Sequence, residues 1–129
     1  MIGKIIASLL TDNVALTTLV NGSNIYPYVI NENTLLPAII YTIDSLETGY
    51  DKDGWVGDIC TFSVVSFSDN YSALQNIVLQ VRSSLELMKG TIEGITIDRI
   101  ELEGLTEGYS IAENCFLNKL TFSARITSY

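Results

Sequence analysis

The sequence predicts an α+β fold: a largely antiparallel sheet of four to five strands with two main helices packed on one face, in the order α-β-β-β-α-β-β. Residues 2–20 and 68–89 repeat apolar side chains at steps of three and four, the spacing of a helix with one buried face. Residues 116–126 alternate apolar and polar side chains, as a strand does when helices cover only one face of its sheet. Short connections between the expected strands favour antiparallel neighbours. We expect one domain, residues 1–129, that is long enough to bury a sizeable core.

The first helical stretch contains a break. Thr11-Asp12-Asn13 are residues that favour helix N-caps, so a second, short helix should begin near residue 13. Asn21-Gly22 should end it, because glycine supplies the left-handed conformation that is common after a helix.

Two apolar segments that each contain a proline mark the start of the sheet. The first is Ile25-Tyr26-Pro27-Tyr28-Val29-Ile30, and the second is Leu36-Pro37-Ala38-Ile39-Ile40-Tyr41. Proline has no N–H to donate to a neighbouring strand, so the first segment predicts an edge strand over 25–30. The second segment predicts a strand over 37–46 that opens on its proline.

The second main helix and the later strands follow from the same reasoning. Ser68 or Asp69 is expected to cap the helix and Gly90 to end it. The apolar period of the fourth strand breaks near Asp98-Arg99, which predicts a β-bulge. The remaining expected segments are a mobile hairpin tip over 47–55, strands over 56–67 and 94–105, a turn over 104–114, and a last strand from 116.

The charge of the chain limits its partners. Its net charge is −8, and residues 44–58 contribute −4 while residues 93–113 contribute −5. Tight binding to a phosphate backbone needs a basic surface, so specific DNA binding is not expected. No stretch is apolar over the roughly 20 residues that a membrane-spanning helix needs, so no membrane partner is expected. The hydrophobic content of 47% favours surface reserved for self-association over a larger core alone.

The sequence carries no recognisable catalytic chemistry. It contains no histidine, and its two cysteines lie far apart in the chain, so histidine-dependent catalysis and a structural zinc site are excluded. Asp51-Lys52-Asp53-Gly54 has the wrong spacing for a calcium loop. Glu101 and Glu103 should share one face of a strand, which is more often a solvated sheet face than an acid–base pair. We expect no enzyme activity, no cofactor and no metal.

Aromatic residues in and beside the expected strands are candidates for an assembly interface. Tyrosine and tryptophan are enriched at interfaces, since they bury a large area and keep a polar group. The alternative is ordinary packing in the core and at the sheet edge. The candidate interface residues are Tyr26, Pro27, Tyr28, Trp55 and Tyr109.

Four segments in order resemble the tail-completion or tail-terminator family of long-tailed bacteriophages. They are Leu19-Val20-Asn21-Gly22, Ile25-Tyr26-Pro27, Leu36-Pro37-Ala38-Ile39-Ile40-Tyr41 and Cys60-Thr61-Phe62-Ser63-Val64-Val65-Ser66-Phe67. The resemblance implies a structural protein of the head–tail junction of the virion, assembled in the bacterial cytoplasm. It implies a hexameric ring that caps the tail tube, stops its growth and joins it to the head connector, while DNA passes through without specific binding. The family offers no catalytic residue to carry over.

A ring through which DNA slides suggests a role for the acidic segments. We expect them to face the lumen or its rim, where six copies would concentrate a charge of about −54 and repel DNA. The alternative is ordinary solubility charge on the outer surface. The candidate acidic residues are Asp44, Glu47, Asp51, Asp53, Glu101, Glu103 and Glu107.

Other functions stay open at this point. The chain could instead be a small non-catalytic adaptor, or a neighbouring connector component, that binds a partner through its edge strand. A monomer in solution is compatible with either function, because a ring can close only once it docks on the tube.

Overall fold

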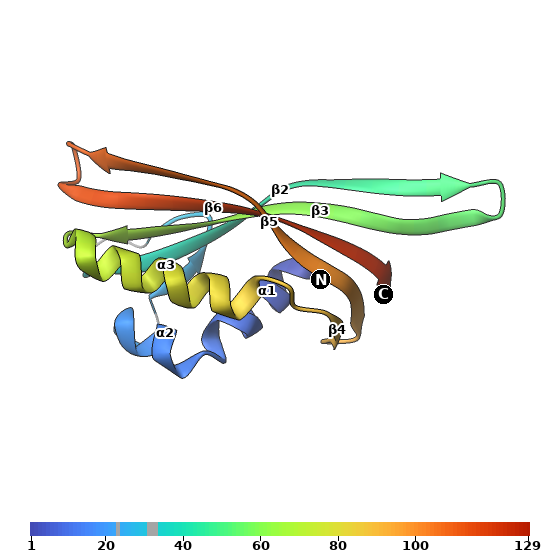
Figure 1. The fold of residues 1–129 in the computed structure, drawn as a ribbon, viewed down its shortest axis with the longest axis horizontal. Coiled ribbons are helices and arrows are strands. Elements are labelled where there is room, and N and C mark those ends of the chain that lie inside the picture. The colour runs from blue at the N-terminus through green and yellow to red at the C-terminus, as the bar shows by residue number, and fades with distance from the viewer. Residues whose placement is uncertain (23, 31–33) are drawn as a thin grey trace.

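The computed structural model of the chain describes residues 1–22, 24–30 and 34–129, and over these residues it is a mixed α+β fold (Figure 1). Three helices lie on one face of a strongly twisted six-stranded sheet. The helices are α1 (Ile2–Thr11), α2 (Val14–Leu19) and α3 (Tyr71–Leu85). The strands are β1 (Ile25–Pro27), β2 (Ala38–Asp51), β3 (Gly54–Ser68), β4 (Gly90–Ile92), β5 (Ile95–Ser110) and β6 (Cys115–Ser128).

The strand order across the sheet is β1-β2-β3-β6-β5-β4. Every neighbouring pair is antiparallel except β1 and β2, which run parallel. The predicted fold class and the largely antiparallel sheet are therefore confirmed. The expected four to five strands were too few, because the short strand β4 was missed. The prediction counted two main helices, and the third helix, α2, is the short one expected near residue 13.

The predicted break in the N-terminal helix is confirmed at Asn13. Its side-chain oxygen accepts a hydrogen bond from the Leu16 N–H at 3.1 Å, which caps α2. Its side-chain amide also donates to the Ser84 hydroxyl at 2.8 Å. The residue that separates the two helices therefore also ties them to α3.

Helix α3 starts and ends elsewhere than predicted. Its N-cap is Asn70, whose side chain accepts from the Ala73 N–H at 3.0 Å, rather than Ser68 or Asp69. Ser68 supports the turn by accepting a hydrogen bond from the Asn70 N–H. The helix ends at Leu85 and not at Gly90, because residues 87 and 88 exchange backbone hydrogen bonds with Ile100 of β5.

The lengths of four strands differ from the prediction. Strand β1 stops at Pro27, since Tyr28 adopts a left-handed φ of 65°, but β1 is an edge strand as expected. The segment 47–55 contains the turn of a hairpin, as expected, but the turn is shorter than predicted: β2 and β3 stay paired until Asp51 and Gly54. Similarly, β5 continues to Ser110 through most of the expected turn. The predicted bulge is confirmed as a register shift between Ile97 and Arg99.

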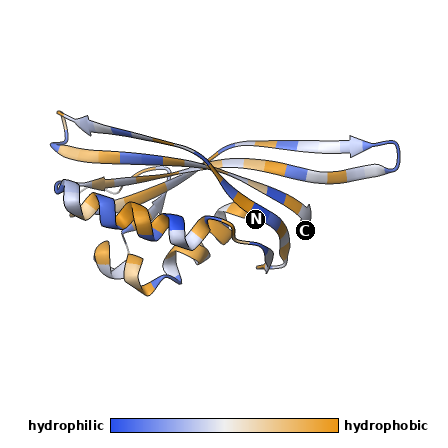
Figure 2. Ribbon diagram, in the orientation of Figure 1, coloured by the Kyte–Doolittle hydropathy of each residue, from blue (hydrophilic) through white to orange (hydrophobic). Residues whose placement is uncertain are grey.

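The core lies between the helices and one face of the sheet. Phe62 of β3 and Phe122 of β6 stack at the centre, with ring centroids 5.4 Å apart, and both are fully buried. Ile5, Leu10 and Ile77 of the helices are also buried in this core. Helix α1 is largely apolar, and α3 alternates apolar and polar residues along its length (Figure 2). Burial of each large side chain contributes about 1.5–3 kcal/mol.

Two parts of the sheet are not covered by helices. The first is its opposite face, here called the uncovered face, which carries the side chains that alternate with the core residues of β2, β3, β5 and β6, such as Ser63, Thr121 and Ser123. The second is the outer part of the β2–β3 hairpin, residues 48–57, here called the arm. Pairing of β3 with β6 ends at Asp58, so beyond this residue only two strands project from the body (Figure 1).

Candidate functional site

The arm exposes apolar and aromatic side chains at one end of the molecule. Tyr50 is 73% exposed and Trp55 is 39% exposed, and Val56 is also exposed. The exposed parts of these side chains contribute no packing energy to the monomer, so they are available for a partner. Trp55 was predicted as an interface residue; it pairs with Tyr50 next to the turn of the arm and is partly exposed.

A carboxylate holds the root of the arm. Asp58 is buried, accepts a hydrogen bond from the Trp55 indole N–H at 2.9 Å and accepts another from the Tyr129 hydroxyl. The rings of Trp55 and Tyr129 lie 5.9 Å apart. The hydrogen bond from Tyr129, followed by that from Trp55, holds the pKa of Asp58 below its usual value. Burial, with the hydrogen bond to Asp58, raises the pKa of Tyr129 to about 12.

The uncovered face brings four of the seven predicted acidic residues together. Asp44 accepts hydrogen bonds from the hydroxyls of Thr42 and Ser63 on this face. Glu103 accepts from Ser123 at 2.7 Å. The other two also lie here: Glu101, which pairs with Arg99 at 2.6 Å, and Glu47, which lines a shallow hollow of about 200 Å³ together with Arg125.

The other three acidic residues lie elsewhere. Asp51 and Asp53 are at the tip of the arm, where the Asp51 carboxylate accepts from the Asp53 N–H at 2.7 Å. Glu107 pairs with Asn118 in the part of β5 nearest the β5–β6 turn, and its side chain lies on the side of the helices. It accepts hydrogen bonds from Gln75 of α3 at 2.8 Å and from two further groups, the Asn118 amide and the Tyr71 hydroxyl. These hydrogen bonds, with that from Gln75 the largest, hold the pKa of Glu107 below its usual value.

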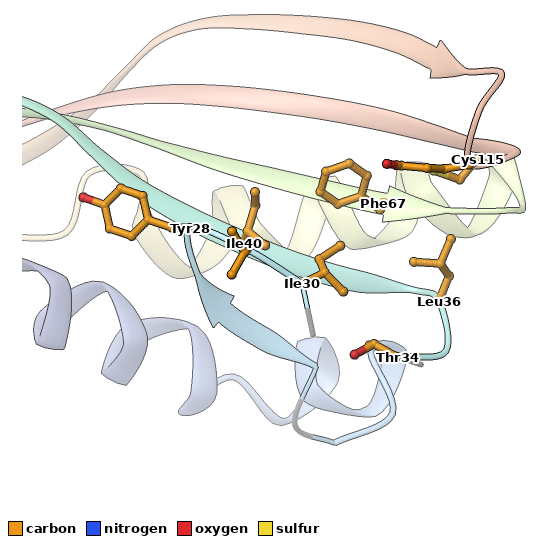
Figure 3. Close-up of a pocket in the computed structure, with 9 residues that line it drawn as sticks. Tyr28, Ile30, Thr34, Leu36, Ile40, Phe67 and Cys115 are labelled. Atoms are coloured by element: carbon orange, nitrogen blue, oxygen red, sulfur yellow. The ribbon is translucent and has the colours of Figure 1, made fainter. Parts of the chain in front are cut away.

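A groove lies beside β1, at the end of the sheet away from the arm (Figure 3). Its volume is about 530 Å³ and its walls are mainly apolar. Ile40 and Phe67 form its floor on the uncovered face, Leu36 and Ile30 come from the connection between β1 and β2, and Cys115 closes one end. The sequence pointed to this region only through its two proline-containing segments.

The five predicted interface residues do not form one surface. Tyr28 lines the groove, and Pro27 is exposed at the end of β1. Tyr26 is half-buried and donates a hydrogen bond to the Asn24 side chain at 3.2 Å. Tyr109 is 50% exposed near the end of β5, where its ring meets Phe116, and Trp55 belongs to the arm. The candidates thus fall on the arm and at the opposite end of the sheet, where the groove and the tip of the β5–β6 hairpin lie next to each other.

The described part of the chain contains no group of three or more side chains placed to hold a metal ion. Burial raises the pKa of the Cys60 thiol to about 11 and also raises that of Cys115, so both thiols stay protonated at neutral pH. None of the helices described has the length and apolar character needed to span a membrane.

The family model described as "Tail completion protein gp17" matches residues 4–127. Among solved structures, a chain of the structure described as "Virion of native gene transfer agent (GTA) particle" superposes with a TM-score of 0.82. It is 14% identical, and the match covers 95% of this chain and 92% of that chain, so it shows a shared fold. No curated protein matches.

Proposed function

The chain belongs to the family of tail completion proteins, which gives it a structural role in virion assembly, and we propose that it forms the ring that ends the tail tube and joins it to the head connector. The observation that carries this proposal is the family match over residues 4–127, nearly the whole chain. The proposed protein partners are other copies of the chain, the tail tube protein and the head connector protein. The role requires no catalysis and no cofactor.

The distribution of exposed apolar residues supports self-assembly. Leu35 is 78% exposed beside the groove, Ile111 is 84% exposed at the tip of the β5–β6 hairpin, and Tyr50 is exposed on the arm. Tyr50 lies on the arm, whereas Leu35 and Ile111 lie toward the opposite end of the sheet, so one copy has separate surfaces for neighbours. Contacts between different surfaces of identical copies close into a ring when the rotation between neighbours allows it. We propose six copies, as the sequence resemblance implies.

We also propose that the acidic residues face the lumen or its rim. Asp44, Glu47, Glu101 and Glu103 share the uncovered face, which none of the described helices covers. If this face lines the ring, these carboxylates meet the DNA and limit its binding to the wall. Asp51 and Asp53, at the tip of the arm, would then lie on the rim. Three cations on the same face, Arg99, Lys119 and Arg125, partly offset the carboxylates.

A second function, that of a small adaptor or a neighbouring connector component, is favoured by one observation. The apolar groove beside the edge strand β1 could take a segment of a partner protein. An adaptor of this kind would bind as separate copies, whereas the ring requires contacts between copies.

Deletion of the gene from a phage that encodes this chain tests the proposed function. We expect DNA-filled heads and separate tails, with tail tubes of irregular length, in electron micrographs of the lysate. Supplying the chain from a plasmid should restore complete particles, and a chain with Phe122→Ala, which disrupts the core, should not. Complete, infectious particles in the absence of the chain would exclude the proposed role.

A further inference from the structure

The sheet has two long open edges, and we propose that they pair with each other between neighbouring copies. In this arrangement, residues 102–110 of β5 in one copy add as an antiparallel strand to residues 43–51 of β2 in the next. The inference rests on the proposed ring and goes beyond it by naming the strands that form the contact. The partner at each edge is a second copy of this chain.

The edge of β2 is covered only at its beginning. Strand β1 pairs with residues 39–41, and the Tyr28 N–H donates to the Tyr41 carbonyl at 3.0 Å. At Ile43 the Tyr28 hydroxyl stands where a neighbouring strand would pair. It accepts a hydrogen bond from the Ile43 N–H at 3.3 Å and donates one to the Ile43 carbonyl at 3.5 Å. From there to Asp51, no strand among the described residues pairs with this edge.

The edge of β5 is also covered only at its beginning. Strand β4 pairs with residues 95–97, and the backbone of residues 87 and 88 pairs with Ile100. Beyond Leu102, within the described ranges, the outer edge of β5 has no strand neighbour up to Ser110. Unpaired edges of this length are templates for another strand, and natural proteins keep them only when they are blocked or used.

The direction of the two strands suits pairing between copies. Strand β2 is antiparallel to β3, β3 to β6, and β6 to β5, so β2 and β5 run in opposite directions at opposite sides of one sheet. Copies related by rotation about one axis would therefore present β5 of one to β2 of the next as antiparallel neighbours. This contact joins two different surfaces, which is the kind that produces a ring and not a closed pair.

The positions of the open edges also set the offset between copies. The open part of β2 runs onto the arm, whereas the open part of β5 lies at the other end of the sheet (Figure 1). Pairing them shifts each copy along its strands relative to its neighbour. Strands with such an offset are tilted relative to the axis of a closed ring, as in a β-barrel.

Charge makes the contact dependent on salt. The β2 edge carries Asp44, Glu47 and Asp51, and the β5 edge carries Glu103 and Glu107. Like charges on both sides oppose pairing, although Glu103 and Glu107 are held on their own sheet by hydrogen bonds from Ser123 and Gln75. Self-association should therefore strengthen as salt screens the charges, with a Debye length of about 3 Å at 1 M salt.

Crosslinking of two single variants tests the pairing. The variants are Ser45→Cys on β2 and Thr106→Cys on β5, both at exposed positions. Ser45 is opposite Thr61 and Thr106 is opposite Lys119, and both of these neighbours point to the uncovered face, so Ser45 and Thr106 point to it as well. The two variants, one of them with a tag that changes its mass, are mixed at 1 M NaCl with a short bis-maleimide. The wild type is the control for the native Cys60 and Cys115, which are buried. A mixture of Thr18→Cys on α2 with Thr106→Cys measures chance collisions.

We expect a crosslinked heterodimer in the Ser45→Cys and Thr106→Cys mixture, at several times the yield of the Thr18→Cys mixture. Crosslinks between two copies of Thr106→Cys alone would indicate a symmetric pair and overturn the proposal. Absence of edge crosslinks would also overturn it. If rings still appear by electron microscopy in that case, another surface forms them, and the proposed function stands without this inference.

A second variant tests the role of Tyr28 at the β2 edge. Tyr28→Phe removes the hydroxyl that is hydrogen-bonded to the Ile43 backbone. A strand from a neighbouring copy then pairs with Ile43 without having to displace that hydroxyl. We expect its dissociation constant for self-association, from sedimentation at 1 M NaCl, to fall by about threefold to tenfold relative to wild type. Tyr26→Phe is the matched control, because its hydroxyl bonds the Asn24 side chain and not the β2 backbone. An equal effect of both variants, or weaker association of Tyr28→Phe, would contradict the proposal.

Discussion

The hydroxyl of Tyr129 donates a hydrogen bond to the carboxylate of Asp58 and so ties the C-terminal residue to the root of the arm. The same carboxylate accepts from Trp55 within the arm. One buried acid therefore connects the end of β6, the arm and the body of the sheet.

Stability should depend on the ionisation of Asp58. The pKa of Asp58 is lower in the folded chain than in the unfolded chain, so its contribution to stability is present above its ordinary pKa of about 4 and is lost as the pH falls below it. We expect Asp58→Asn to lower the urea midpoint at pH 5.5, and the difference from wild type to shrink at pH 3. Asp53→Asn, at the exposed arm tip, should leave both midpoints nearly unchanged. An equal effect of Asp58→Asn at both pH values would show that the charge of Asp58 does not contribute to stability.

The same pair should be visible at high pH. The pKa of Tyr129 is raised to about 12, and the hydrogen bond to Glu107 also raises the pKa of Tyr71, so the last of the seven tyrosines to form its phenolate should be Tyr129, well after the ordinary pKa of about 10. Because the pKa of Tyr129 is higher in the folded chain than in the unfolded chain, its protonated hydroxyl contributes to stability below pH 10. This contribution is lost as the pH rises through about 12. Titration of the phenolate absorbance should show this late step in wild type, lose it in Tyr129→Phe, and shift it to lower pH in Asp58→Asn. A late step that persists in Tyr129→Phe would assign it to another tyrosine.

The core depends on the stacked rings of β3 and β6. Phe122 is fully buried against Phe62, so Phe122→Ala should cost about 3–5 kcal/mol of unfolding free energy in urea. Leu79→Ala changes a side chain on α3 that is 63% exposed, and it should alter stability by less than about 0.5 kcal/mol. Similar effects of the two substitutions would mean that the helices do not pack on this face of the sheet.

The acidic arm tip offers a test of the lumen proposal in assembled particles. Changing Asp51 and Asp53 to lysine reverses the charge at the tip without touching the core. If the tips lie at the rim of a DNA passage, attraction to phosphate should slow genome ejection, and the delay should shrink at high salt. Thr17→Lys with Thr18→Lys adds cations on α2 at a distance from the arm and should leave ejection unchanged. Unchanged ejection kinetics in the Asp51 and Asp53 variant would place the tips away from the DNA.

The sequence allowed the fold class and several boundaries to be predicted because they depend on local chemistry. The cap at Asn13 and the edge position of β1 follow from a capping side chain and from a proline that cannot donate. The cap of α3 was placed one or two residues too early, because Ser68, Asp69 and Asn70 are all good capping residues in a row. The fold selects Asn70, whose side chain reaches the Ala73 N–H.

The arm could not be predicted in the same way. Residues 47–55 contain Gly49 and Gly54 together with acidic residues, a composition typical of a loop, yet they continue a paired hairpin. The partners that hold the site together also lie far apart in sequence. The bonds from Tyr129 to Asp58 and from Gln75 to Glu107 join separate elements and leave no local pattern.

Cryo-electron microscopy of the head-proximal end of isolated tails would show whether this chain forms the ring. We expect one closed ring at the end of the tail tube, built from six copies of this chain, with density for a β5–β2 contact between neighbours. Tails that lack the chain, or that carry it as separate copies without contacts between them, would contradict the ring.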